Sequence, residues 1–386
     1  GAADDRTVAR VTINGNIVVS GGTFTATGTG NSYTDIIITV NGNVNVTGSG
    51  SQLSISRGSQ GGTGTCTWYM KGDVSYGPAT ANQNSTEPGT DSTTLVPRGK
   101  FVFCKNGTQT VTLDSTIAWT GRCNMQFGDG TTPTIVNIGN SPFIGSATIQ
   151  RIMPNAKVII GPDGYIGGGT NGSNVKSKFY MEDGGTMVLA SQSGIRATDH
   201  GSSGAVRVSG LRNYGTNGNF EYNGTQRQRL GSGLPASLRN LVINNAIGVY
   251  ADTLTAFTVN DTLAINTCNL ALDSSACVAT LGPSATLIEG EGHSCHGSLA
   301  VTRKVNADVD ETFKGIGLTL HAIGIAPDTT TVTRIAGVAQ AGDTTHSILR
   351  AYDISPKINT GLNASMTFTY YPSELNGQDA SQLLLW

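Results

Sequence analysis

Two pairs of neighbouring acids are the side chains in this sequence best suited to acid–base chemistry. Glu182 and Asp183 precede two glycines, and Glu289 and Glu291 flank Gly290. Cleavage of a glycosidic bond needs two carboxylates that converge on that bond. Adjacent residues of a strand face opposite sides of the sheet, so Glu182 and Asp183 would not converge, and the glycines favour solvated turns. We therefore expect no catalytic residue and predict that the chain is not an enzyme.

The segment His293–His296, with the sequence His-Ser-Cys-His, holds the clustered histidine and cysteine residues. Such side chains can bind zinc, but a cysteine in a disulfide lacks the thiolate that a metal ligand needs. The Asp129-Gly130 and Asp163-Gly164 turns could lend oxygens to Ca²⁺, although neither has the acidic spacing of a calcium loop. We expect turn residues here, no metal site and no cofactor, with Ca²⁺ as the alternative.

The even number of cysteines predicts disulfides and an oxidising compartment. The six cysteines include no Cys-x-x-Cys pair, so neither a zinc ribbon nor a redox motif is indicated. Cys268 and Cys277 are close in sequence and are the first pairing that we expect. The chain opens Gly-Ala-Ala-Asp-Asp, without a basic or apolar leader, which suits an end left by signal-peptide cleavage. The disulfide candidates are Cys66, Cys104, Cys123, Cys268, Cys277 and Cys295.

Composition indicates a weakly charged, β-rich chain. Gly accounts for 52 of 386 residues, charged residues for 13% and aromatic residues for 6%, and the net charge is −2. An average soluble chain has about 25% charged residues, and this balance offers no basic surface for nucleic acid. Apolar runs such as Ile36–Val40 are far shorter than a membrane-spanning helix. We predict neither a nucleic-acid partner nor a transmembrane segment.

An internal repeat predicts the organisation of the chain. Thr12–Val19 (TINGNIVV) is matched by Thr39–Val46 (TVNGNVNV), and the pattern returns at Thr258–Ile265 (TVNDTLAI). Repeats at this spacing form stacked units that are too thin to bury their apolar faces alone. We predict tight turns at the Asn-Gly and Asn-Asp dipeptides, because Asn and Gly tolerate positive φ. Asn-Gly hairpins in antiparallel sandwiches are the alternative.

The fold class predicted from this pattern is all-β, with parallel β-helix or solenoid-like repeats followed by an antiparallel β-sandwich. The repeat region is expected over residues 1–296, and longer alternating strands indicate the sandwich over residues 297–386. Residues 77–94 have no large apolar side chain and hold two prolines. We expect them to form a loop that projects from the repeats.

The later part of the chain contains the segments Phe220–Gly224, Gly233–Pro235, Leu238–Ala246, Thr331–Gly337, Tyr352–Pro356, Asn359–Ala364 and Ser373–Gly377. Through these segments, about residues 215–386 resemble large secreted proteins of the Bacteroidota. The similarity is to the region that often precedes the C-terminal sorting domain of type IX secretion cargo. It implies export to the cell surface or the medium and assigns no catalytic residue. The sequence departs from the family in ending at Trp386, where relatives continue into the sorting domain.

This resemblance also implies O-glycosylation at Asp-Ser and Asp-Thr dipeptides that an apolar residue or Thr follows. Glycans on these hydroxyls would shield a weakly charged surface. The alternative is that a Thr-rich chain contains such tripeptides by chance. The candidate hydroxyls belong to Ser92, Ser115, Thr253, Thr262, Thr329 and Thr344.

We expect a secreted structural or adhesive protein of the cell surface that self-associates into an extracellular filament or surface assembly through β-strand pairing. A solenoid exposes unpaired strand edges at its terminal coils. The alternative is a polysaccharide lyase or hydrolase, or a glycan-binding β-helix protein with surface glycans as partners. An enzyme needs a cleft with convergent groups, whereas a subunit needs exposed β surfaces. The residues expected in assembly strands are Ile13, Ile17, Val19, Leu383, Leu385 and Trp386.

Overall fold

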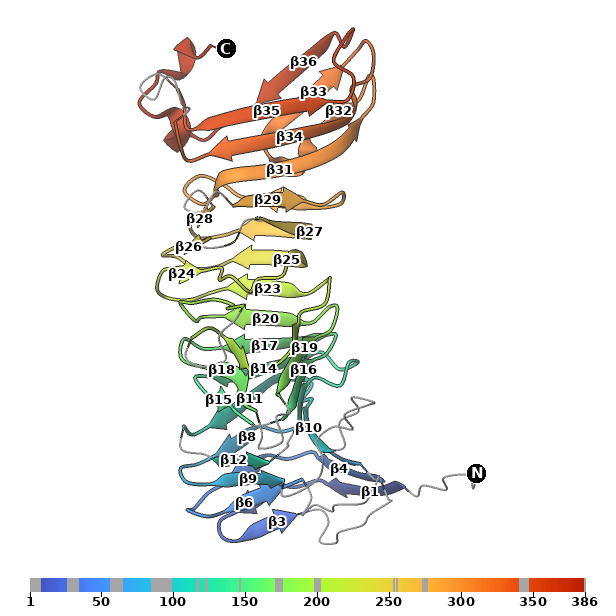
Figure 1. Ribbon diagram of the computed structural model, residues 1–386, viewed down its shortest axis with the longest axis vertical. Coiled ribbons are helices and arrows are strands. Elements are labelled where there is room, and N and C mark those ends of the chain that lie inside the picture. Colours follow the sequence, from blue (N-terminus) through green and yellow to red (C-terminus); the bar gives the residue numbers. More distant parts are fainter. Residues whose placement is uncertain are drawn as a thin grey trace. The chain divides into compact units, whose positions relative to one another are not determined.

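The computed structural model is all-β and divides into two compact units (Figure 1). Unit 1 comprises Gly1–Ser191 and Thr198–Gly218, and unit 2 comprises Gln192–Ala197 and Asn219–Trp386. No helix in the part of the chain that the structure describes is long and apolar enough to cross a membrane. The structure describes residues 8–25, 35–55, 65–84, 99–115, 118–121, 124–145, 147–170, 176–197, 203–252, 254, 256–272, 277–339 and 347–384.

Unit 1 is a stack of coils whose successive strands belong to different parallel sheets. The first coil contains β1 (Val8–Ile13), β2 (Ile17–Val19) and β3 (Thr23–Thr25), and these begin sheets A, B and C, respectively. Each later coil returns to sheets A and B in the same order, which is the connectivity of a β-solenoid.

The sheets of unit 1 continue as follows. Sheet A adds β4 (Asp35–Val40), β7 (Cys66–Met70), β10 (Gly99–Phe103), β13 (Asn124–Phe127), β16 (Ile149–Ile152), β19 (Lys178–Met181) and β22 (Arg212–Asn213). Sheet B adds β5 (Val44–Val46), β8 (Val74–Tyr76), β11 (Gly107–Leu113), β14 (Thr134–Gly139), β17 (Ala156–Ile160) and β20 (Thr186–Leu189). Sheet C adds β6 (Gln52–Ser54), β9 (Ala81–Asn84) and β12 (Ala118–Gly121), and β15 (Pro142–Phe143), β18 (Tyr165–Gly168) and β21 (Val206–Val208) form a further sheet.

The core of unit 1 is a column of inward side chains from successive coils. Side chains alternate across a strand, and in-register pairing places the inward side chain of each coil over that of the preceding coil. Trp68 and Phe101 are fully buried neighbours, with ring centroids 6.1 Å apart. Phe103 stacks on Phe127 at 5.6 Å, and Phe143 closes the group at 5.4 Å from Phe127. A few aromatic residues therefore suffice for a continuous core.

The first two copies of the repeat are adjacent coils, which confirms the stacking prediction. Thr12 pairs with Thr39 in sheet A, and Ile17 pairs with Val44 in sheet B. Side-chain oxygens at the corner also join the coils, because Asn16 Oδ1 accepts from the Asn43 N–H and Asn43 Oδ1 accepts from the Asp73 N–H, both at 2.8 Å. The hairpin alternative is wrong, because β1 and β2 pair with the next coil and lie in different sheets.

The corner glycines have a different role from the one predicted. Gly42 and Gly72 do not have positive φ. A Cβ atom on Gly42 would lie 2.4 Å from the carbonyl oxygen of Gly15, and one on Gly72 would lie 2.2 Å from that of Gly42. These positions need glycine because the backbones of neighbouring coils approach too closely for any side chain.

Unit 2 begins with further parallel coils of two strands each. The longer strands β23 (Asn219–Tyr222), β25 (Ser237–Ile243), β27 (Ala256–Ile265) and β29 (Val278–Leu281) form one sheet with the first part of β31 (Cys295–Val305). The shorter strands β24 (Gln228–Arg229), β26 (Val249–Tyr250) and β28 (Leu270–Ala271) form the other. The turn predicted at Asn260-Asp261 is wrong, because β27 runs straight through these residues and its register against β25 shifts there instead.

The sheet changes from parallel to antiparallel pairing at β31. This strand is parallel to β29 on one edge and antiparallel to β34 (Asp328–Ala336) on the other, and β35 (Arg350–Pro356) follows β34. A second antiparallel sheet contains β32 (Asp310–Glu311), β33 (Leu318–Ala322) and β36 (Ala364–Phe368). The predicted fold class is therefore confirmed, whereas the domain boundary at residue 297 stays a prediction.

Two local predictions differ from the structure. Within the expected loop of residues 77–94, Ala81–Asn84 form β9, which pairs with β6 and β12, and residues 85–94 lie outside the described residues. Leu383 follows the 3₁₀ helix η4 (Ala380–Gln382) and belongs to no strand. Leu385 and Trp386 lie outside the described residues.

We predict that Gly42→Ala destabilises unit 1 by about 1–3 kcal/mol, the usual cost of forcing backbone apart in a packed structure. Gly15→Ala is the matched control, because a Cβ atom there meets no atom within 4 Å. Urea denaturation followed by circular dichroism measures both variants. Equal stability of the two variants would contradict the close stacking of the corners.

Candidate functional site

The outer edge of the first coil is the candidate functional site. β1, β2 and β3 each pair with the second coil, through β4, β5 and β6, and begin their sheets. An edge strand presents backbone N–H and C=O groups that another strand can pair with. The same coil carries exposed apolar side chains: Val8 (46% exposed), Val11 (48%), Val18 (64%) and Phe24 (41%).

Alternation along β1 identifies the backbone groups that face outward. The Ile13 carbonyl accepts from the Asn41 N–H at 2.9 Å, so Ile13 is turned toward the second coil. In a parallel ladder the N–H and C=O of one residue point to the same side, and successive residues alternate. Thr12, Arg10 and Val8 therefore direct their N–H and C=O groups away from β4.

The structure places the predicted assembly residues of this end in the edge strands, but their side chains are not the exposed ones. Ile17 and Val19 are buried in the core of the coil, and Ile13 is half-buried. Sequence reasoning missed Val8, Val11 and Phe24. Their β-forming character was visible, but their exposure follows from their position in the first coil.

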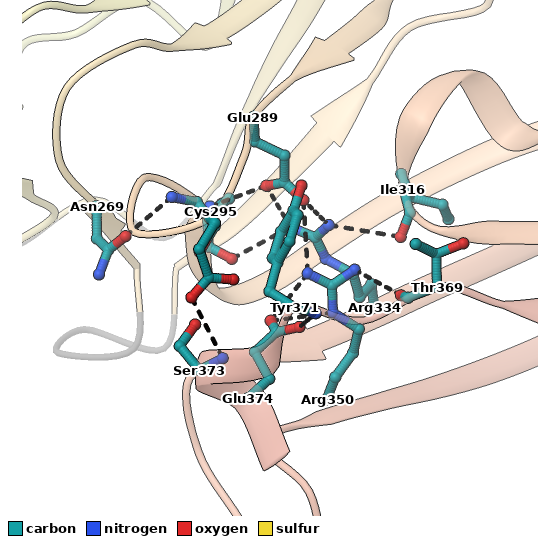
Figure 2. A network of polar contacts seen from close by, with 12 residues as sticks. Asn269, Glu289, Cys295, Ile316, Arg334, Arg350, Thr369, Tyr371, Ser373 and Glu374 are labelled. Carbon is teal, nitrogen blue, oxygen red and sulfur yellow. Dashed lines mark hydrogen bonds and ion pairs between the residues drawn. The ribbon is translucent and has the colours of Figure 1, made fainter. Parts of the chain in front are cut away.

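A second polar cluster lies at the antiparallel part of unit 2 (Figure 2). The two carboxylate oxygens of Glu289 accept hydrogen bonds from the two terminal nitrogens of Arg334. The distance from Arg334 Nη2 to Glu289 Oε2 is 2.9 Å. Arg350 donates to Glu374 Oε1 from Nε at 3.0 Å and from Nη2 at 2.8 Å, and its Nη2 lies 3.6 Å from Glu289 Oε1. Two acids and two guanidinium groups thus form one buried, electrically neutral network.

Separate segments supply this network. Glu289 follows β30 (Thr286–Ile288) and accepts from the Cys295 N–H at 3.0 Å. Arg334 occupies an inward position of β34, and Arg350 begins β35. Glu374 lies in the 3₁₀ helix η3 (Pro372–Leu375), where its Oε2 accepts from the Tyr371 N–H at 2.8 Å. The network therefore ties the turn after β30 to both antiparallel strands and to η3.

The electrostatics indicate a structural role for Glu289. Burial by itself lowers the pKa of Arg334, but the hydrogen bonds and the charge of Glu289 outweigh burial and hold that pKa above its ordinary value. The side chains of Glu289 and Arg334 are 3% and 0% exposed. Both carboxylate oxygens of Glu289 are already occupied by guanidinium groups and a backbone N–H, so they have little capacity to bind a metal.

The other candidate acids also have partners. Glu182 pairs with Arg151 at 2.5 Å, and Glu291 accepts from the Ser373 N–H at 3.2 Å. Asp183 accepts from the Thr216 and Asn217 N–H groups, which hold the pKa of its carboxyl below the usual range. Glu182 and Glu289 belong to different units.

The histidine and cysteine cluster does not form a metal site in the structure. His293 Nδ1 lies 2.7 Å from the Ile265 carbonyl oxygen. Within the described ranges, no group of three His, Cys, Asp or Glu side chains is arranged to hold a metal ion. Asp129 instead accepts from Thr131 and Thr132, and despite its partial burial these hydrogen bonds lower the pKa of its carboxyl to about 2.

The described cysteines form no disulfide with one another, and the expected pairing of Cys268 with Cys277 is not made. Cys66 donates to the Ile55 carbonyl at 3.2 Å, and Cys123 lies outside the described residues. Buried thiols pack as small apolar groups.

The predicted O-glycosylation sites fall in different environments. Ser115 and Thr329 are exposed and Thr262 is half-buried in β27, whereas Ser92, Thr253 and Thr344 lie outside the described residues. Comparison of the chain with known protein families, curated proteins and solved structures finds no match in any of the three. The resemblance to secreted Bacteroidota proteins stays a prediction.

We predict that Glu289→Gln destabilises unit 2 by about 3–5 kcal/mol, because it leaves the buried charge of Arg334 without its partner. Glu182→Gln is the matched control, and loss of its partly exposed ion pair costs at most about 1 kcal/mol. Thermal denaturation measures both. A stability loss that is no larger for Glu289→Gln would show that the network is not needed for folding.

We also predict that Cys104 and Cys277 resist alkylation in the folded protein and react, without reductant, after unfolding. Burial raises the pKa of each thiol to about 11, and the thiolate is the reactive form. Because the unfolded thiols ionise near pH 9, the stability that these groups contribute is lost as pH rises above about 9. Iodoacetamide labelling at pH 8 with peptide mass spectrometry is the measurement. Failure to label after unfolding would indicate disulfides.

Proposed function

We propose that the protein is a secreted structural or adhesive protein of the cell surface that self-associates through strand pairing at its first coil. The observation that carries this proposal is the outer edge of β1 and β2, which among the described strands pair only with the second coil and lie beside exposed apolar side chains. The export and surface location rest on the resemblance of residues 215–386 to secreted proteins.

The proposed occupant of this edge is a strand from a second copy of the chain. Outward N–H and C=O groups on Val8, Arg10 and Thr12 give β1 the capacity for several intermolecular hydrogen bonds, each contributing about 1 kcal/mol net. Val8 and Val11 add apolar area at about 25 cal/mol per Å² buried. Backbone pairing supplies affinity, and the alternating side chains supply register.

Strand pairing between copies of the chain can give either a closed dimer or an open filament. Pairing of one first coil with another gives a two-fold dimer, whereas pairing with a different edge of the next copy continues into a filament. Unit 2 offers such edges: β35 pairs only with β34, and β36 pairs only with β33, among the described strands. Met366 on β36 is 45% exposed.

We predict that Arg10→Pro abolishes assembly and leaves the fold intact. Proline removes the Arg10 N–H, which faces away from β4, and is tolerated on an edge strand. Arg10→Ala is the matched control, because it removes the same side chain and keeps the N–H. Sedimentation velocity and electron microscopy of the 386-residue chain should show assemblies for the wild type and Arg10→Ala, and monomers for Arg10→Pro. A wild-type chain that stays monomeric at high concentration would refute self-association, and assembly of Arg10→Pro would exclude this edge.

A further inference from the structure

One column of outward side chains crosses five successive strands of sheet A. The register aligns Tyr69 with Val102, then Gln126, Arg151 and Tyr180. Val102 is fully buried, whereas the other four side chains are partly exposed. Neighbouring strands lie about 4.8 Å apart. A linear molecule that runs across β13, β16 and β19 would therefore meet the next side chain of the column at each coil.

The adjacent outward column contributes lysines. Lys100 aligns with Asn124 in β13, and Ile149 aligns with Lys178 in β19. The outward positions of β7, β10, β13, β16 and β19 hold Lys100, Arg151 and Lys178 and no acid. Glu182, directly after β19, is the acid that pairs with Arg151. The face thus has an excess of positive charge in a chain whose net charge is −2.

Lys100 and Arg151 flank a shallow pocket on this face. The residues that line it are Lys100, Asn124, Met125, Gln126, Ile149 and Arg151. Lys100 Nζ donates to Gln126 Oε1 at 3.0 Å, and Gln126 Nε2 donates to the Gly128 carbonyl at 2.8 Å, which turns the amide oxygen toward the lysine. Lys100 has no ion-pair partner among the described residues.

Arg151 is held in place from two sides. Its Nη1 donates to Glu182 Oε1 at 2.5 Å, and its guanidinium carbon lies 5.0 Å from the centre of the Tyr180 ring. These contacts fix the guanidinium plane and leave further N–H donors. Two positioned cations with unused donors therefore face one pocket.

This arrangement has an electrostatic cost that an anion would offset. Partial burial and, next, the charge of Arg151 lower the pKa of Lys100. Like charges held close together disfavour each other's charged forms, and charge-assisted hydrogen bonds to a carboxylate or sulfate would satisfy both groups. Tyr180, in the same column, offers a ring and a hydroxyl of the kind that contact sugars.

We propose that the outer face of sheet A in unit 1 is a binding site for a linear acidic polysaccharide, with a carboxylate or sulfate group of the polymer held between Lys100 and Arg151. The polymer would cross β13, β16 and β19, so that successive sugar units meet Gln126, Arg151 and Tyr180. This site belongs to later coils than the assembly edge of β1, so binding and assembly are separate properties.

Binding of sodium polygalacturonate, chondroitin sulfate, neutral dextran and a DNA duplex to the 386-residue chain tests the proposal. We expect the two acidic polysaccharides to bind, with an affinity that falls as salt increases, and dextran not to bind. Lys100→Met should weaken binding about tenfold, as expected for loss of one charge-assisted hydrogen bond. Lys304→Met, at an exposed position of β31 in unit 2, is the matched control and should bind like the wild type.

Circular dichroism establishes that Lys100→Met is folded, and Lys178→Met provides a second variant with an expected partial loss. Unchanged binding by a folded Lys100→Met, or equal binding of dextran, would overturn the proposal. DNA binding of equal affinity, lost in the same variant, would replace the polysaccharide with a general polyanion and overturn it as well. The monomeric Arg10→Pro variant should retain polysaccharide binding, so failure of self-association would not be mistaken for failure of this site.

Discussion

Backbone hydrogen bonding between one coil and the next is the constraint on which this structure depends. No coil of unit 1 can satisfy its own backbone groups, because its strands lie in different sheets and pair only with neighbouring coils. In-register pairing then places like positions over one another. The aromatic column from Trp68 to Phe143 and the corner glycines at Gly15, Gly42 and Gly72 both follow from this repetition. Among the described strands, β1 and β2 of the first coil pair on one side only.

The antiparallel part of unit 2 meets a different requirement. The backbone groups of β31 must form hydrogen bonds with a parallel strand on one edge and with an antiparallel strand on the other. The network of Glu289, Arg334, Arg350 and Glu374 lies where this change of direction occurs and has partners for each of its charges. Replacement of a complete buried ion network by apolar residues can be neutral, but removal of one member is costly. We infer that its value is to fix how β34, β35 and η3 pack together.

The sequence predicted the parts of the fold that repeat. The match between Thr12–Val19 and Thr39–Val46 gave adjacent coils with the correct register, because identical residues at a fixed spacing can be compared directly. The third copy failed at Asn260-Asp261, where β27 continues through the dipeptide and its register against β25 shifts, in place of a tight turn. The residue pattern of the third copy alone could not predict this shift, since the register of β27 depends on β25 in the preceding coil.

The candidate sites were less predictable than the fold. Glu289 was visible as an acid near glycine, but Arg334 is 45 residues away in sequence and nothing local joins the two. The same holds for Lys100 and Arg151, which are brought to one pocket by strand register across β13. Val8 and Val11 carry an ordinary strand pattern, and their exposure depends on where their coil lies in the stack.

The short sequence separation between paired coils has a consequence for how the chain folds. Asn41 bonds to Asn14 over 27 residues and Asn240 to Asn219 over 21, and this separation does not grow as coils are added. Each coil therefore has a similar loop-closure cost and can add to an edge that has already formed as the chain emerges during synthesis. The bonds from Arg334 to Glu289 and from Ser373 to Glu291, over 45 and 82 residues, are exceptions. Folding of unit 2 would accordingly proceed coil by coil and finish with the slower closure of its ion network.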